Sequence, residues 1–376
     1  MTLKKYFSYT WKVRYNMNKL QCKLFTGEWE NNLFMQVLLG FCDKGYKIDE
    51  KDIEKILPKV LESTPDDLAK ILMNYLKKNT SRILKEHRAD ANYFCKMLNS
   101  RWKTPINLLE LLLIVAIDAG NVFNDELRPK AESNCDYSFD ILTRLQGRAC
   151  QVAGEIISLI KAGYADGANA RWRTLHEIAV VSFIISSFGK IVSEKYLDHE
   201  VIESYKAMLE YNKYASGIGC EPISDDEMKE LTNIKNQLCE KYGNSFSSQY
   251  GWAAEITQKK KPTFNDLEIL VNIDHLKPYY RMASHSVHAN PKGIKFKLSL
   301  IPNNSEIILA GPGDTGFADP GHCAAISLYQ ITTSLLCTNP TIIAMGTLKF
   351  MGNLVDEIGE AFLEVQKGLE EESNME

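Results

Sequence analysis

Residues 104–127 have the sequence TPINLLELLLIVAIDAGNVFNDEL, which predicts a long apolar helix. Thr104 is a suitable N-cap residue, and Pro105 suits the first helical position because its backbone lacks an N–H group. The side chains on both sides of Glu110 are nearly all apolar. A helix that is apolar on every side belongs in the interior of a protein. We therefore expect this helix to be buried.

The polar segment of residues 127–138, LRPKAESNCDYS, follows this helix and is the best candidate for a domain boundary. It contains Pro129, and proline and small polar residues are typical of the segments between domains. The length of 376 residues also exceeds that of one ordinary domain. We therefore predict an N-terminal helical domain of residues 1–130 and a helical bundle domain of residues 131–376.

The second half of the chain opens with two long helical patterns, at residues 139–163 and 168–188. The connection AGYADGAN is short, which favours two antiparallel helices in a bundle. Two further helices are predicted near residues 321–338 and 341–369, where they close the chain. The sequence therefore predicts a helical bundle for this half.

The hydrophobic period changes between the two pairs of helices, in IKFKLSLIPNNSEIILAG. Apolar residues alternate with Lys295, Lys297 and Ser299, and a turn signal follows at residues 302–304. Alternation of this kind is typical of two strands joined by a tight turn. The predicted fold class is therefore mainly α, with a helical bundle, a small β-hairpin near residues 294–310, and an N-terminal helical domain.

Charge and cysteine content limit the partners and the compartment of the protein. The net charge is −4, from 44 Lys and Arg and 48 Asp and Glu, so nucleic acid would have to bind at a local basic patch. The 9 cysteines include no C-x-x-C pair, which is typical of free thiols in a reducing compartment. The N-terminus lacks the apolar stretch of a signal peptide, and the apolar runs are shorter than a membrane span requires. We expect a soluble, cytoplasmic protein without a membrane partner.

The segment YYRMASHSVHANPKG, residues 279–293, contains the sharpest candidate for a functional site. It begins as an amphipathic helix and ends at residues that terminate helices. On a continuous helix Arg281 and His288 lie two turns apart on nearly one face, and His285 lies one turn from either. The sequence therefore predicts one arginine and one histidine in a shared groove.

Two interpretations of this segment remain open. Histidine can take the proton of a 2′-hydroxyl near neutral pH, while arginine binds the scissile phosphate, so the pair suits RNA cleavage without a metal. Arginine and histidine at the C-terminus of a helix also stabilise the helix by compensating its dipole. In the second interpretation the two residues have a structural role and no catalytic one.

A second group of polar residues lies in the segment NARWRTLHEIAVV, where Arg173, His176 and Glu177 fall on one predicted helix. The apolar residues that follow indicate that this helix is buried, and buried charges need partners. We expect these residues to support Arg281 and His288 across the bundle, in one polar pocket. The alternative is a buried ion pair that only fixes the positions of the helices.

Histidine and cysteine side chains that could bind zinc occur at His285, His288, His322 and Cys323. Structural zinc sites usually contain closely spaced pairs of cysteines, which this chain lacks. We therefore predict that the protein holds no tightly bound metal and uses no cofactor.

The arginine and the histidine on a late helix of the bundle resemble the signature of the HEPN ribonucleases, in which a histidine follows an arginine after a few residues. Residues 139–338 also resemble a bacterial domain family of unknown function. That second resemblance is carried by the segment ARWRTLHE and by the later segment SHSVHANP.

The resemblance to HEPN ribonucleases implies a role for each residue of the motif. Arg281 would bind the phosphate and His288 would act as acid and base, with His285 as the rival histidine. It also implies a homodimer that cleaves or binds RNA, in antiviral defence or as a toxin. The alternative function is that of a non-catalytic helical module that binds a protein or nucleic-acid partner.

Overall fold

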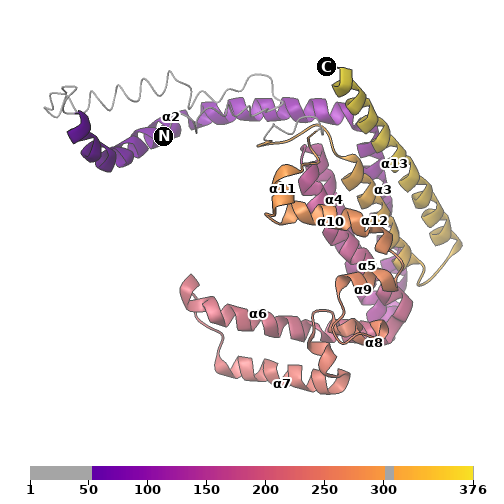
Figure 1. Cartoon of the computed structure of the whole chain (residues 1–376). Coiled ribbons are helices and arrows are strands. Elements are labelled where there is room, and N and C mark those ends of the chain that lie inside the picture. The colour runs from indigo at the N-terminus through magenta and orange to yellow at the C-terminus, as the bar shows by residue number, and fades with distance from the viewer. Residues whose placement is uncertain (1–52, 301–308, 376) are drawn as a thin grey trace. The chain divides into compact units, whose positions relative to one another are not determined.

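The computed structural model describes residues 53–300 and 309–375 (Figure 1). Contacts between Cα atoms divide the chain into two compact units. The first comprises Met1–Leu98 with Glu306–Gly311, and the second comprises Asn99–Ser305 with Pro312–Glu376. Secondary structure within the described ranges is helical and includes no β-strand. The prediction of a mainly α fold with a helical bundle is confirmed.

The helices follow one another with short connections, several of which are single 3-10 turns. In chain order the α-helices are α2 (Ile53–Arg101), α3 (Lys103–Ser133), α4 (Tyr137–Lys161), α5 (Ala165–Asp198), α6 (Glu200–Tyr214), α7 (Asp225–Tyr242), α8 (Ala254–Thr257), α9 (Phe264–Leu270), α10 (Lys277–Val287), α11 (Pro291–Lys295), α12 (Ala318–Leu336) and α13 (Ile342–Met375). The long helices predicted at residues 139–163, 321–338 and 341–369 correspond to α4, α12 and α13.

Helices α3, α4, α5, α12 and α13 form the bundle of the second unit, in which α5 packs against α4, α12 and α10 (Figure 1). Helices α4 and α5 are antiparallel neighbours, as their short connection predicts. The side chain of Trp172 on α5 is fully buried, and its indole Nε1 donates a hydrogen bond of 3.0 Å to Ser327 Oγ on α12. A large apolar ring is thus buried without leaving its one polar atom unpaired.

The predicted β-hairpin is wrong where the structure describes it. Residues 291–295 form the one-turn helix α11, and the residues up to 300 form a turn. The helix begins here because Pro291 occupies its first position and Asn290 caps it, accepting a hydrogen bond of 2.8 Å from the backbone N–H of Gly293. Residues 301–308, which include most of the expected second strand, lie outside the described residues.

The division of the chain into compact units falls between residues 98 and 99, whereas the sequence places the domain boundary near residue 130. Helix α3 continues through Pro129 to Ser133, and it packs against α4, α12 and α13. Its buried side chains, such as Leu112 and Phe123, belong to the core of the bundle. The polar segment after it is therefore a connection within the second unit.

Helix α3 is only half buried, so the expectation that it lies wholly in the interior is wrong. Ile114 and Val122 are 55% and 54% exposed on its outer face. By length and composition alone, α3 and the helical segment Ala165–Ile218 could each cross a membrane. In the structure both helices contribute to the bundle, and their buried faces pack against other helices.

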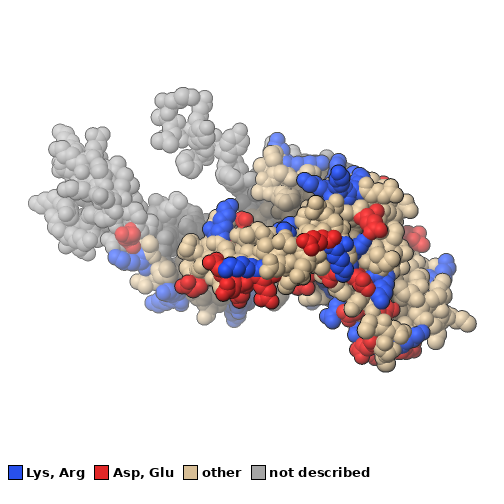
Figure 2. All heavy atoms as spheres, turned by 90° about the horizontal axis from the view of Figure 1, so that it is seen from below, with Lys and Arg blue, Asp and Glu red and all other residues tan. Residues whose placement is uncertain are grey.

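Charged side chains of both signs are interspersed over the face of the described residues that Figure 2 shows. This distribution agrees with the small net charge of the sequence, −4. A site for an anionic partner must therefore be local, formed by a few residues of one sign.

Helices α12 and α13 approach so closely at Gly321 that we expect any side chain there to destabilise the bundle. A Cβ atom on Gly321 would lie 2.5 Å from the ring of Phe362, which is fully buried and cannot move toward solvent. Gly321→Ala should lower the free energy of unfolding by about 1–3 kcal/mol, as overpacking does. Urea unfolding of the full chain measures this change.

The matched control is Gly346→Ala in α13, where a Cβ atom would have no atom within 4 Å. This change should raise the free energy of unfolding by about 0.5–1 kcal/mol, because alanine favours helix. Equal effects of the two substitutions would show that the contact between Gly321 and Phe362 does not limit the packing of these helices.

Candidate functional site

A pocket of about 810 Å³ lies between α10, the start of α11 and the turn that precedes α10. We call it the α10–α11 pocket. Its charged, imidazole and amide side chains come from Asp274, His275, Lys277, Arg281, His285, Asn290 and Lys292. Arg281 and His285 are one turn apart, so both side chains reach the same opening. Two residues of the predicted motif are therefore brought together.

The α10–α11 pocket has an excess of positive charge. Lys277, Arg281 and Lys292 line it against the single carboxylate of Asp274. Lys277 donates to the side chain of Asn265, whereas Arg281 and Lys292 form no ion pair or side-chain hydrogen bond with any described residue. Their donors remain available to an anion in the pocket.

The ring of His285 is held by Asn290, whose amide nitrogen Nδ2 lies 2.9 Å from His285 Nδ1. The orientation of this amide is fixed, because its oxygen accepts the hydrogen bond from the backbone N–H of Gly293. Nδ2 must then be the donor toward His285, and Nδ1 the acceptor. In the neutral ring the proton is therefore on Nε2, and His285 offers a hydrogen-bond donor at that atom.

Gly293 allows this arrangement. A Cβ atom at this position would lie 2.3 Å from the backbone oxygen of His285 and 3.2 Å from that of His288. Only glycine lets α11 approach the end of α10 closely enough for Asn290 to reach the imidazole ring.

His288 does not share the groove with Arg281 as the sequence predicts. Helix α10 ends at Val287, and His288 has extended backbone angles, φ −106° and ψ 139°. Its side chain is exposed and does not line the α10–α11 pocket. The prediction assumed a helix that continues through His288, whereas the chain leaves the helix to reach the cap of α11.

The polar residues of α5 meet a different residue of α10. Arg173 Nη2 donates a hydrogen bond of 2.7 Å to Tyr280 Oη, and Tyr280 Oη donates one of 2.5 Å to Glu177 Oε1. The Arg173 guanidinium also lies over the Tyr280 ring, 4.5 Å from its centre. Burial raises the pKa of Tyr280 well above its ordinary value, so the hydroxyl keeps its proton.

His176, the third polar residue of this segment, is fully buried against α9. Its Nε2 atom is 2.9 Å from Glu268 Oε1, and both side chains are inaccessible to solvent. The buried atoms His176 Nδ1 and Arg173 Nε have no hydrogen-bond partner among the residues that the structure describes. This cluster connects α5 to both α9 and α10.

The predicted pocket of Arg173, Glu177, Arg281 and His288 is therefore not formed. Arg173 and Glu177 bond to Tyr280 on the side of α10 that faces α5. Sequence reasoning missed Tyr280, Glu268 and Asn290. The signal for Asn290 was present, since an asparagine followed by proline is typical of the start of a helix.

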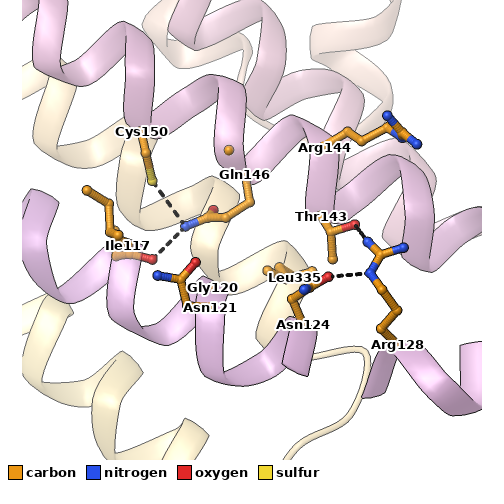
Figure 3. Close-up of a pocket in the computed structure, with 12 residues that line it drawn as sticks. Ile117, Gly120, Asn121, Asn124, Arg128, Thr143, Arg144, Gln146, Cys150 and Leu335 are labelled. Carbon is orange, nitrogen blue, oxygen red and sulfur yellow. Dashed lines mark hydrogen bonds between the residues drawn. The ribbon is translucent and has the colours of Figure 1, made fainter. Parts of the chain in front are cut away.

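A second pocket, of about 540 Å³, lies between α3 and α4, and Leu335 of α12 also lines it (Figure 3). We call it the α3–α4 pocket. Asn121, Asn124 and Arg128 of α3 point into it, together with Thr143 of α4 (Figure 3). The signal in the sequence was a line of polar residues with helical spacing on an apolar helix.

No group of three metal-binding side chains lies close enough to hold an ion in the part of the chain that the structure describes. Of the residues considered for zinc, His322 and Cys323 line a pocket with Asp319 and Asp356 of α12 and α13. That pocket does not include His285, and burial raises the pKa of the Cys323 thiol to about 12.

Residues 139–306 match a family of unknown function, DUF5677. The matched region includes α4, α5 and the whole α10–α11 pocket, whereas α3, α12 and α13 lie outside it. No curated protein and no solved structure matches the chain.

Helix α9, which carries Glu268, depends on a cap with a strong pH dependence. Asp266 accepts hydrogen bonds from Lys259 Nζ at 2.6 Å and from the backbone N–H and hydroxyl of Thr263 at 2.9 Å and 2.8 Å. Lys259, followed by Thr263, lowers the pKa of Asp266 from 3.8 to about 2. The folded state therefore favours the ionised carboxylate.

We expect Asp266→Asn to lower the free energy of unfolding at neutral pH by about 1 kcal/mol, the usual contribution of a helix cap. Because the folded pKa is the lower one, the contribution is complete above the unfolded pKa of about 4 and is lost as pH falls through the folded value. The difference between the variant and the wild type should therefore shrink between pH 3.8 and about 2. Urea unfolding at several pH values measures it.

Asp125→Asn is the control, because Asp125 is an exposed residue of α3 with no ion pair or side-chain hydrogen bond to a described residue. It should leave the free energy of unfolding unchanged. A difference for Asp266→Asn that is independent of pH would contradict the assigned role of its charge.

Proposed function

We propose that the α10–α11 pocket binds a phosphate group of RNA. The observation that carries this proposal is the presence of Arg281 and His285 in one pocket with Lys277 and Lys292, against a single carboxylate. A guanidinium group offers two parallel donors that match two phosphate oxygens, and the lysines add charge. The Nε2–H group of His285 supplies a further donor to a phosphate oxygen.

RNA cleavage is the second part of the proposal, and it assigns the two histidines different roles. A base must accept the 2′-hydroxyl proton, and the Nε2 atom of neutral His285 already carries a proton. His288 is exposed, and its ring forms no hydrogen bond with a described residue. His288 lies outside the pocket, just past the end of α10, so in the proposed reaction its ring turns toward an RNA whose phosphate is held by Arg281. It then takes the 2′-hydroxyl proton, and Arg281 stabilises the charge on the phosphate oxygens.

The bonds in this reaction follow the usual course of RNA transesterification. The 2′-oxygen forms a bond to phosphorus, the bond from phosphorus to the 5′-oxygen breaks, and the 5′-oxygen takes a proton from water. The hydroxide that remains takes the proton from His288, which returns to its starting state. We propose that the protein acts in this way as a cytoplasmic homodimer, in antiviral defence or as a toxin, as the resemblance to HEPN ribonucleases implies.

One observation favours the second function, a helical module that binds a protein. Ile342 and Ile343, at the start of α13, are 93% and 81% exposed. Two adjacent isoleucines with this exposure are typical of a surface that another protein covers. Absence of RNA binding by the wild type at low salt would favour this function over the first.

The division of roles predicts different effects for two substitutions. Arg281→Ala should weaken binding of a mixed-sequence RNA and reduce the slope of log affinity against log salt by about 1, because one phosphate contact is lost. His288→Ala should leave RNA affinity unchanged and lower cleavage by about 100-fold, as expected for loss of a general base. Affinity at several salt concentrations and single-turnover cleavage measure the two effects.

Arg148→Ala is the control for the loss of a surface charge, because Arg148 is exposed on α4 and does not line the α10–α11 pocket. It should change neither quantity. Equal RNA affinities of Arg281→Ala and the wild type at low salt would contradict the proposed phosphate site. Unchanged cleavage by His288→Ala would remove that histidine from the reaction.

The hydrogen bond between Asn290 and His285 predicts the tautomer of the ring. In the neutral form of the ring, the nitrogen chemical shifts of His285 should show a protonated Nε2 atom in the wild type. In Asn290→Asp the carboxylate accepts a hydrogen bond and cannot donate one, so the proton should move to Nδ1. The assigned imidazole signals of ¹⁵N-labelled protein measure this change.

The same spectrum contains its control, because His288 is not bonded to Asn290 through its ring and should keep its signals in the variant. A wild-type ring with its proton on Nδ1 would contradict the role of Asn290.

A further inference from the structure

We propose that the α3–α4 pocket binds a small molecule with an apolar body and one carboxylate group. This inference is independent of the RNA site, since the two pockets share no residue. It rests on three observations: the space between the two helices, the hydrogen-bonded and uncharged residues at the floor of the pocket, and N–H groups at one end that make no hydrogen bond to a described residue.

Two glycines keep the α3–α4 pocket open. A Cβ atom on Gly147 of α4 would have no atom within 4 Å, and one on Gly120 of α3 would lie 3.1 Å from Gln146 Cγ. Larger residues at these positions would fill the space between the helices. The volume of about 540 Å³ lies in the range of pockets that hold small molecules.

The polar side chains at the floor of the pocket already form hydrogen bonds, and they carry no charge. Gln146 is buried, and its amide nitrogen donates to Ala116 O at 3.0 Å (Figure 3) and also to Thr332 Oγ1 at 3.1 Å. Burial raises the pKa of the Cys150 thiol to about 11, so the thiol is neutral at physiological pH. With the side chains of Ile117 and Leu335, these residues form a surface suited to an apolar group.

Arg128 is held in place at the polar end. Its Nε atom donates to Asn124 Oδ1 at 2.9 Å, and Nη2 lies 3.5 Å from Thr143 Oγ1 (Figure 3). The guanidinium also lies 5.3 Å from the centre of the Phe139 ring. A side chain fixed by three contacts loses little conformational entropy when it binds a ligand.

The guanidinium nevertheless has Nη–H groups that make no hydrogen bond to a carboxylate in the described part of the chain. The nearest carboxylate oxygens, of Glu132 and Asp140, are each 3.7 Å from Nη1, beyond normal hydrogen-bond distance. Asp140 is instead bonded to Arg144 Nε at 2.8 Å. Arg128 Nη1 therefore forms ion pairs with both carboxylates, but within the described ranges its N–H groups make no direct hydrogen bond to either.

Two asparagines add to the excess of donors. The oxygen of Asn124 is used by Arg128, which leaves its amide nitrogen as a donor, and Asn121 has no side-chain hydrogen bond to a described residue. A ligand must therefore supply acceptors. A planar carboxylate matches the guanidinium and carries one charge, whereas a doubly charged phosphate would be repelled more strongly by Asp140 and Glu132.

The experiment is calorimetric titration of the full chain with straight-chain and phenyl-substituted monocarboxylic acids of four to ten carbons, and with their primary amides. The wild type should bind at least one acid, and the matching amide should bind about tenfold to a hundredfold more weakly, because it lacks the charged hydrogen bond. Arg128→Met should lower affinity for the acid by the same factor. Gly147→Leu, which fills the pocket, should abolish binding of both ligands.

Two matched control variants distinguish changes at the pocket from the general effects of removing an arginine or adding a side chain. Arg148→Met removes an exposed arginine of α4 that does not line the pocket, and Gly346→Leu adds a side chain to another open helical glycine; both should bind as the wild type does. Circular dichroism of each variant establishes that it is folded. Failure of the folded wild type to bind any of these acids at millimolar concentration, or equal affinities of Arg128→Met and the wild type, would overturn the proposal.

Discussion

The burial of polar side chains on α5 is the constraint on which the site depends. Arg173 and His176 lie on a helix that packs against α4, α12 and α10, and a buried charge or imidazole needs a partner. The partners come from Tyr280 on α10 and Glu268 on α9. Once Tyr280 points toward α5, the rotation of α10 about its own axis is fixed.

That rotation places the next residues of α10. Arg281 follows Tyr280 by one position, about 100° around the helix, so it cannot face α5 at the same time. It lines the α10–α11 pocket instead, with His285 one turn later. The polar cluster inside the bundle and the basic pocket outside it are thus two faces of one short helix, and the first determines the second.

Local signals in the sequence were enough to predict the elements, but not the contacts between distant residues. The short connection before α5 correctly predicted antiparallel helices, and an apolar period predicted α12 and α13. The contact of Arg173 with Tyr280 spans 107 residues, and no local pattern indicates which of two adjacent residues on α10 faces inward. The hairpin failed because alternation of apolar residues is a weaker determinant here than the cap at Asn290 and the proline after it. The same cap ended α10 before His288, which removed the predicted alignment with Arg281.

Asn290 has two roles in one amide group, since its oxygen starts α11 and its nitrogen bonds the ring of His285. Helix α11 has only 5 residues, too few to be stable without its cap and its neighbours. If this single turn unwinds, the amide is free to rotate by half a turn and present its oxygen to the imidazole. The proton of the ring would then move to Nδ1, and Nε2 would carry a lone pair in its place. The persistence of one helical turn therefore governs whether Nε2 of this histidine donates or accepts a hydrogen bond.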